Sequence, residues 1–359
     1  MIIDPWGSEL PEDYSKIVKD FGLDVFDSKL FPEPNRLMRR GVIFAGRDLK
    51  RIADCIKQGK KYYALSGIMP TADRIHFGTK MVVEQLRYFQ DHGAHTYILV
   101  ADLEAQASRG VSLEEGKRRA LEFHIPAYIA LGLNPKKTSF YFQSENMHVM
   151  QIAFDAANHL TANEFKAAYG SNEPGRILSV VTQFGDMLYP QLAERMPGII
   201  PVGIDQEPHV RLCRDYIGKV SSKKYVPISS IYHKYTRALN GDLKMSKSKP
   251  ESMLELPEDL SSVEKKIKRA LTGGRDTIEE HRKLGGDVKN DMVFELLKQH
   301  LVENDSELKE IHDKYVSGEM LSGELKKIAI DKMNEFMTDF EEKLASARSQ
   351  IKNLHFVGK

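Results

Sequence analysis

The sequence contains few cysteines and little net charge. Cys55 and Cys213 are the only two cysteines in 359 residues, and their separation offers no metal-ligand spacing. We therefore expect two buried thiols, which fit a reducing cytoplasm. The formal net charge is +1, so no overall electrostatic field indicates a nucleic-acid partner. Any contact with RNA must then depend on local basic patches.

Long hydrophobic runs are missing as well. No apolar stretch reaches the roughly 20 residues that a membrane-spanning helix needs, so no membrane partner is expected. Residues 1–5 lack the basic and apolar regions of a signal peptide. These absences favour a cytoplasmic globular protein. Its 359 residues exceed one ordinary core, so two or three domains are expected.

Apolar runs that fit strands alternate with amphipathic helical patterns between residues 61 and about 255. The strand candidates are 62–66, 96–101, 139–142, 199–203 and 225–231. This alternation predicts an α/β fold in which a Rossmann-like parallel sheet carries helices on both faces. Such sheets bind ligands beyond the carboxyl ends of their strands. His76, Asp102, Glu104 and Asp205 follow predicted strands and could reach that crevice.

The ends of the chain differ from this alternating region. Residues 1–60 form an N-terminal extension that prolines break into short pieces. Its basic residues Arg39 and Arg40 fit either a solvated surface helix or a segment with a functional role. The Rossmann-like domain then covers 61–260, with a helical insertion at about 105–195. Residues 261–359 have helical patterns throughout and predict an all-helical C-terminal domain.

One short basic segment is suited to phosphate chemistry. Lys244, Met245, Ser246, Lys247 and Ser248 follow an Asn-Gly turn and precede Pro250, so they are expected to form a loop. Two ammonium groups and two hydroxyls suit a polyphosphate, because lysine acts as a point charge toward phosphate oxygens. The alternative is a solvated basic loop without a ligand.

A second motif strengthens the phosphate interpretation. Residues 70–79 follow the first predicted strand of the sheet and lead into a helical pattern. The N-terminus of a helix binds anions because its unpaired N–H groups point at the ligand. His76 could donate to a phosphate there, and Gly78 would let a nucleotide approach the backbone closely. An isolated His-x-Gly is weak support, but its pairing with the lysine segment is specific.

Together the two motifs resemble those of class I aminoacyl-tRNA synthetases. Residues 244–248 match that family's Lys-Met-Ser-Lys-Ser loop letter for letter, whereas Thr79 replaces the second histidine of its His-x-Gly-His motif. Other segments resemble the tryptophanyl-tRNA synthetases of archaea and eukaryotes. They are residues 4–6, 39–41, 203–208, 272–282 and 317–326.

This resemblance implies a function and a set of site residues. The enzyme would activate L-tryptophan with ATP and Mg²⁺ and transfer it to tRNA(Trp), as a homodimer whose C-terminal domain binds the anticodon. The expected catalytic residues are His76, Lys244 and Lys247. The expected ATP-binding residues are Pro70, His76, Gly78, Thr79, Gly203, Asp205, Lys244, Met245, Ser246, Lys247 and Ser248. The candidates for tryptophan binding are Glu104, Gln183 and Gln206, and no resident metal site is expected.

Three alternatives share part of this pattern. A tyrosyl-tRNA synthetase has both motifs, but residues 272–282 and 317–326 favour the tryptophanyl group. A small-molecule nucleotidylyltransferase uses similar His-x-Gly-His chemistry, but it needs no helical C-terminal domain. A catalytically weak paralogue that only binds tRNA is favoured by Thr79 and disfavoured by the intact lysine segment. Leu65 also stands where eukaryotic relatives carry tyrosine, so the wall of the amino-acid pocket would differ.

Overall fold

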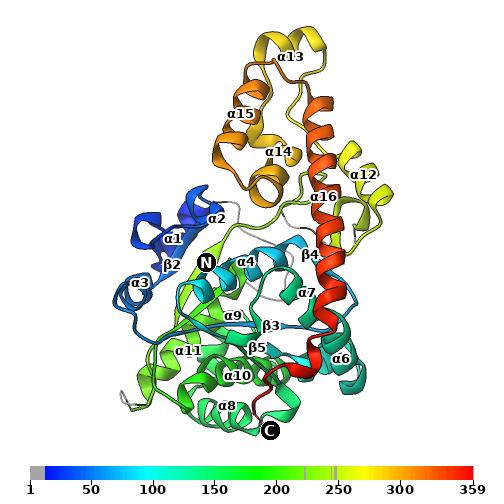
Figure 1. Cartoon of the computed structure of the whole chain (residues 1–359). Helices are drawn as coiled ribbons and strands as arrows, with labels where there is room; N and C mark the ends of the chain where they lie inside the picture. The colour runs from blue at the N-terminus through cyan, green and yellow to red at the C-terminus, as the bar shows by residue number, and fades with distance from the viewer. Residues whose placement is uncertain (1–12, 222–223, 244, 246–248, 359) are drawn as a thin grey trace.

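A seven-stranded sheet organises the molecule (Figure 1). The computed structural model describes residues 13–221, 224–243, 245 and 249–358. The strands lie in the order β1-β2-β8-β7-β3-β5-β6, and the last five of these run parallel. Their bounds are Asp24–Val25 (β1), Ile43–Arg47 (β2), Tyr63–Ile68 (β3), His95–Val100 (β5), Thr138–Phe142 (β6), Gly198–Gly203 (β7) and Ser229–His233 (β8). The predicted parallel sheet is confirmed, although β8 begins later than expected.

Each face of the sheet packs against its own layer of helices, because successive side chains of a strand point to opposite faces. One core joins the sheet to α3 (Leu49–Gln58), α4 (Phe77–Asp91) and α7 (Ile125–Ala130). A second core lies against α8 (Met147–His159), α9 (Ala162–Tyr169), α10 (Pro174–Leu188) and α11 (Glu207–Lys219). Burial on both faces explains why the central strands read as nearly continuous apolar runs.

The region between β5 and β7 is helical apart from β6. In addition to α7, α8, α9 and α10, it contains α5 (Asp102–Arg109), α6 (Leu113–Arg119) and the π-helical turn η2 (Ala120–His124). The strand that interrupts these helices lies at one edge of the sheet. The chain therefore leaves the sheet between residues 102 and 138, returns for one strand and leaves it again.

The N-terminal extension contributes two strands that the sequence does not predict. β1 and β2 are antiparallel, and β2 pairs with β8. The same extension holds α1 (Tyr14–Phe21) and α2 (Arg36–Arg39). The expectation of a solvated charge is wrong for Arg40, because its side chain is only 6% exposed. Arg40 donates instead to the backbone carbonyls of Lys298, Val302 and Glu303.

The C-terminal part is helical in the residues described, as predicted. Its elements are α12 (Leu260–Arg269), α13 (Ile278–Leu284), α14 (Met292–Leu296), the π-helical turn η9 (Leu297–Leu301), α15 (Asp305–Val316) and α16 (Ser322–Arg348). Most of them form the upper part of Figure 1, whereas α16 runs down from there beside α7. Their core extends to Phe77 and α7. After α16 the chain returns to the sheet, where Phe356 forms a parallel bridge with Phe140 of β6.

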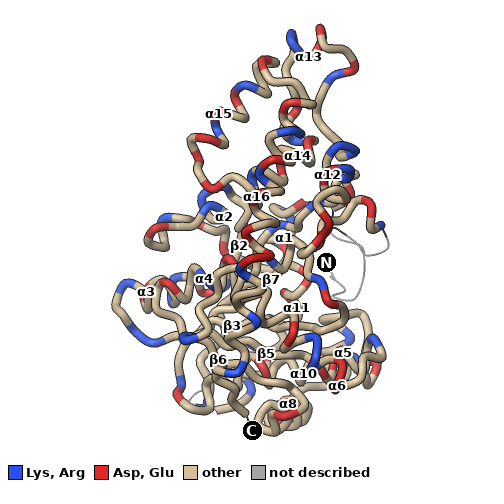
Figure 2. The backbone as a smooth tube through the Cα atoms, turned by 45° about the vertical axis from the view of Figure 1, so that its right-hand side comes forward, with Lys and Arg blue, Asp and Glu red and all other residues tan. Residues whose placement is uncertain are grey.

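Charges of both signs are spread over the whole molecule, including the helical C-terminal part (Figure 2). This distribution agrees with the near-zero net charge of the sequence. Within the described stretches, no helix is both long and apolar enough to span a bilayer.

Candidate active site

A cavity opens where β3 and β7 end, and we call it the central cavity. It collects six residues that the sequence assigns to ATP binding: His76, Gly78, Thr79, Gly203, Asp205 and Met245. Ser66, Tyr128, His233 and Thr236 line it as well. The position is the one expected for a doubly wound sheet, at the carboxyl ends of neighbouring parallel strands.

His76 joins two elements at the rim of the central cavity. It ends the short strand β4 (Ile75–His76), which pairs with β9 (Glu255–Leu256), and it is the N-cap residue of α4. Gly78 leaves room for its ring, because a Cβ atom at this position would lie 2.8 Å from Cε1 of His76. The first turn of α4 also carries unpaired N–H groups and a partial positive charge, both of which favour a phosphate.

Gly203 has a similar role on the opposite wall. It ends β7, and Asp205 follows in the 3₁₀ turn η6 (Ile204–Gln206). A Cβ atom on Gly203 would lie 2.6 Å from Oδ1 of Asp205. The glycine therefore allows the carboxylate to fold back over the end of the strand. A carboxylate in that place can accept hydrogen bonds from ribose hydroxyls.

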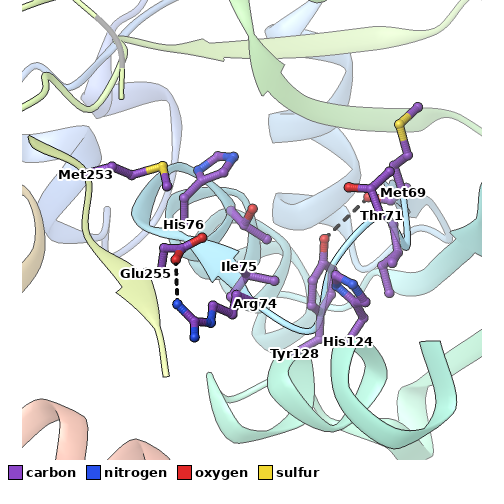
Figure 3. A pocket seen from close by; sticks show the side chains of 12 residues that line it. Met69, Thr71, Arg74, Ile75, His76, His124, Tyr128, Met253 and Glu255 are labelled. Carbon is purple, nitrogen blue, oxygen red and sulfur yellow. Dashed lines mark hydrogen bonds and ion pairs between the residues drawn. The ribbon is translucent and has the colours of Figure 1, made fainter. Parts of the chain in front are cut away.

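A second cavity, the side cavity, lies beside His76 (Figure 3). It shares Gly67, His76, Thr79 and Tyr128 with the central cavity. Arg74 and Glu255 line it and form an ion pair with a distance of 3.0 Å between Nη1 and Oε2. Pro70 does not line any of these cavities, and it packs toward Gly116 of α6 instead.

Arg74 is a site residue that the sequence analysis overlooked, although it lies within residues 70–79. Among the described residues that line the central, side and deep cavities, it is the only lysine or arginine. A triphosphate needs positive partners. Arg74 lies two residues before His76, and the β4–β9 pairing brings its ion-pair partner Glu255 beside it from about 180 positions further along the chain.

A third cavity, the deep cavity, adjoins the central cavity. The two share Ser66, Gly67, Val82, Gly203 and Gln206. All three tryptophan candidates, Glu104, Gln183 and Gln206, line it, as does Leu65. Its remaining walls are largely apolar. They include Leu99, Met187, Ile200, Val202 and Val210.

Glu104 and Gln183 are hydrogen-bonded to each other in the deep cavity. Nε2 of Gln183 donates to Oε2 of Glu104 at 3.0 Å, and Ser179 Oγ donates to the same oxygen at 2.6 Å. Gln143 donates to the other oxygen of Glu104 at 3.1 Å. The carboxylate is therefore oriented by three donors from two elements. This fixed arrangement can present a polar wall to a ligand that is otherwise surrounded by apolar side chains.

Asp186 is a second polar group of the deep cavity that the sequence analysis did not assign. The side chain is almost fully buried in α10 and accepts from Tyr141 at 3.0 Å and from Gln143 at 2.7 Å. Burial, together with the negative charges of Glu104 and Asp102, raises its pKa well above the usual range. The protonated form of Asp186 is therefore favoured relative to an exposed aspartate. No local sequence pattern connects Asp186 with its donors Tyr141 and Gln143, because the three residues come from α10, β6 and the turn after β6.

The lysine segment is only partly visible. Lys244, Ser246, Lys247 and Ser248 lie outside the described residues. Met245 lines the central cavity, and its N–H donates to the carbonyl of Thr236 at 3.3 Å. Lys249 pairs with Asp242 at 2.7 Å.

Comparison with known proteins indicates one family. The family described as tRNA synthetases class I (W and Y) matches residues 57–338. A tryptophan–tRNA ligase of Methanocaldococcus jannaschii is 40% identical, with 97% of this chain and 96% of the relative covered. Another from Aeropyrum pernix is 37% identical, with the same coverage of 97% and 96%.

Solved structures agree with the sequence comparisons. The crystal structure of tryptophanyl-tRNA synthetase from Aeropyrum pernix has a TM-score of 0.90 at 36% identity, and 99% of each chain is covered. The tryptophanyl-tRNA synthetase of Plasmodium falciparum has a TM-score of 0.85 at 26% identity, with 94% and 97% covered.

Proposed function

The chain belongs to the class I tRNA synthetases for tryptophan and tyrosine, and from this premise we propose that it is a tryptophan–tRNA ligase. The observation that carries the proposal is the shared wall of the central and deep cavities. An amino acid whose side chain lies in the deep cavity presents its carboxylate to the α-phosphate of ATP in the central cavity. The relatives' names then identify tryptophan as the amino acid.

The proposed reaction has two steps. A carboxylate oxygen of tryptophan attacks the α-phosphorus, the bond from that phosphorus to the bridging oxygen breaks, and pyrophosphate leaves. A ribose hydroxyl at the 3′ end of tRNA(Trp) then attacks the carbonyl carbon of the adenylate, and AMP leaves. Neither step needs a covalent enzyme intermediate, so catalysis consists of positioning and stabilisation of charge on the phosphates.

For ATP, we assign the α-phosphate to His76 and the first turn of α4, and the ribose to Gly203 and Asp205. Lys244 and Lys247 are assigned to the leaving pyrophosphate, with Ser246 and Ser248 as hydroxyl donors. Mg²⁺ is expected to arrive with ATP, bound by phosphate oxygens and water.

For tryptophan, the deep cavity offers an apolar slot with a polar end. The indole N–H needs one acceptor and the ammonium needs oxygen partners. Glu104, Gln183 and Gln206 can supply them. Gln206 lies on the wall shared with the central cavity, which suits the end of the amino acid that reacts with ATP.

The decisive experiment is exchange of labelled pyrophosphate into ATP with each of the twenty amino acids alone. Tryptophan should support exchange, and tRNA(Trp) should then accept it. Exchange with tyrosine instead would identify the other substrate of the family. A nucleotidylyltransferase or a protein that only binds tRNA would show no exchange with any amino acid.

We further propose a symmetric homodimer formed through α8 and α10. Met147 and Phe154 are two turns apart on one side of α8 and are 68% and 72% exposed, and Leu178 of the adjacent α10 is 60% exposed. Apolar side chains exposed together on packed helices favour association, and twofold dimers are the commonest oligomers. Light scattering should give twice the chain mass, and Phe154→Glu should give the monomer. A monomeric native protein at micromolar concentration would refute the dimer.

The helical C-terminal part is proposed to read the anticodon. Four basic residues gather on α12, namely Lys265, Lys266, Lys268 and Arg269. The cluster is partly neutralised, because Lys266 pairs with Glu258 and Lys268 pairs with Glu264. The remaining members, Lys265 and Arg269, can contact phosphate. Charging of anticodon variants of tRNA(Trp) should be impaired while pyrophosphate exchange is unchanged. Equal charging of variant and native tRNA would disprove this role. We place the enzyme in the cytoplasm, which its two buried free cysteines suit.

A further inference from the structure

One side chain of the C-terminal part, His300, contacts Phe77 beside His76 and also Thr236, which is bonded to Met245. His300 lies on the π-helical turn η9 and is 2% exposed. A π-helical turn is wider than an α-helical one, is rare, and is frequently found at functional sites. The sequence gives no signal for this turn.

The His300 ring contacts the residue that starts α4. Its centroid lies 5.0 Å from that of Phe77, with an angle of 81° between the rings, which is an edge-to-face arrangement. Phe77 stands between His76 and Gly78 and is fully buried. A shift of the His300 ring therefore moves the backbone that carries His76 and the first turn of α4.

The same ring is bonded to the residue that holds Met245. Nε2 of His300 lies 3.2 Å from Oγ1 of Thr236, and the carbonyl of Thr236 accepts from the N–H of Met245. Thr236 and Met245 both line the central cavity. His300 is thus linked to Met245 of the lysine segment through Thr236 alone.

A third contact fixes the backbone of this turn to α4. Lys80, four residues after His76, donates from Nζ to the carbonyl of His300 at 3.3 Å. Lys80 also pairs with Glu84, which binds Arg36, and Arg36 pairs with Glu303. Burial and the positive charges of Lys80 and Arg36 lower the pKa of His300 well below its usual range. The ring is therefore neutral and its bond to Thr236 is an ordinary hydrogen bond.

We propose that His300 is a positioning residue. It sets the distance between the ATP-binding segment at His76 and the one at Met245, and it makes that distance depend on how the C-terminal helices pack against the sheet domain. This inference rests on the proposed function. In the transition state the groups near residue 76 and those near residue 245 must act on one phosphate chain. Small errors in their spacing lower the rate of activation.

The test compares His300→Phe, Thr236→Val and the double variant in the pyrophosphate exchange assay. His300→Phe keeps a ring against Phe77 and removes the hydrogen bond. Each single variant should lower kcat about two- to tenfold with little change in KM for tryptophan, because one neutral hydrogen bond is lost. The double variant should be no slower than either single variant, because both remove the same bond. His300→Gln, whose amide nitrogen reaches a similar position, should restore most of the rate.

His281→Phe is the matched control. This second buried histidine of the C-terminal part is bonded to the carbonyl of Met320 at 2.9 Å and packs against Tyr315, outside all three cavities. It should leave kcat unchanged. Unchanged kcat in His300→Phe, or additive effects in the double variant, would overturn the inference. If His300→Phe did not fold, Thr236→Val alone would decide by the same criterion.

The assay also separates this inference from the proposed function. Exchange supported by an amino acid other than tryptophan refutes the proposed substrate, and the His300 comparison is then made with that amino acid. Absence of exchange with every amino acid overturns both.

Discussion

Thr79 is the position at which this chain departs from the motif of its family. It is the third residue of α4 and lines both the central and the side cavity. Its hydroxyl can donate one hydrogen bond, whereas histidine would add reach and, when protonated, charge. The helix N-terminus supplies partial positive charge with either side chain. The substitution therefore weakens the site without removing its main features.

Titrations with ATP test this interpretation. Thr79→Ala should lower kcat/KM for ATP by roughly three- to tenfold, because a neutral hydrogen bond contributes about 0.5–1.5 kcal/mol. Thr79→His should be as fast as the native enzyme or faster. KM for tryptophan should be unchanged in both. Strong inactivation of a folded Thr79→His variant would show that residue 79 does not occupy the second histidine position of the motif.

Asp186 makes the stability of the fold depend on pH. Its pKa is raised in the folded state by burial and by Glu104 and Asp102, whereas an unfolded aspartate titrates at about 3.9. Between these two pKa values the folded protein binds more protons, so the free energy of unfolding falls as pH rises. The largest slope from one group is about 1.4 kcal/mol per pH unit.

Asp186→Asn should remove this contribution. The amide resembles the protonated acid in shape and can still accept from Tyr141 or Gln143. Urea unfolding at pH 5, 6.5 and 8 should show a shallower decline for the variant than for the native protein. Equal slopes would mean that Asp186 is ionised in the fold and that its neighbours stabilise the charge.

At the scale of elements, sequence patterns predict what is local and miss what depends on distant partners. β3 and β5 are mostly apolar, and the sequence predicts both to within two residues at each end. β8 begins at Ser229 because Pro227 has no N–H, and because the N–H of Val226 donates to Gln191. The sequence does not predict β2, because only its first three residues, 43–45, are apolar and the strand is completed by pairing with β8.

The site shows the same division. The residues that motifs mark, such as His76 and Gly203, do line one cavity. Arg74 and Asp186 carry no signal of their own, since their roles depend on Glu255 and Tyr141 from other elements. The turn η9 was missed for a related reason. The carbonyl of Lys298 in this turn and that of Val302 directly after it accept from Arg40, which lies in the N-terminal extension.

This contact predicts a large effect for Arg40 and a small one for its neighbour. Arg40→Met keeps the apolar stem but leaves the part-buried carbonyls of Lys298 and Val302 without this donor and removes one of the two arginines that donate to Asp305, so it should cost about 3 kcal/mol of unfolding free energy. Arg39→Met is the matched control. Arg39 pairs with the same Asp305 but is 40% exposed, and its loss should cost no more than about 1 kcal/mol. Chemical denaturation measures both, and equal effects would show that Arg40 does not stabilise the end of η9.

At the scale of the whole molecule, the C-terminal part is anchored to the catalytic part at both of its ends. The chain leaves the catalytic part through β9 and returns through α16, whose 27 residues span about 40 Å. Beyond α16, the N–H of Phe140 donates to the carbonyl of His355 at 2.8 Å, and the N–H of Val357 donates to the carbonyl of Phe140 at 2.8 Å. The final residues thus cover β6, which is an edge strand and would otherwise expose unpaired groups.

The last prediction follows from this return of the chain. The ring of Phe356 stacks on Phe142 with 5.8 Å between centroids, so Phe356→Ala should lower the free energy of unfolding by about 2 kcal/mol. The exposed Lys352→Ala in the same tail should have little effect. Because Phe356 supports the sheet and not the distal helices, Phe356→Ala should also shorten the lifetime of pyrophosphate exchange activity at raised temperature. A variant that loses tRNA charging but keeps native thermal stability of exchange would show that the tail belongs functionally to the tRNA-binding helices. In that case all residues after about 275, including this tail, would function in tRNA binding and none in amino-acid activation.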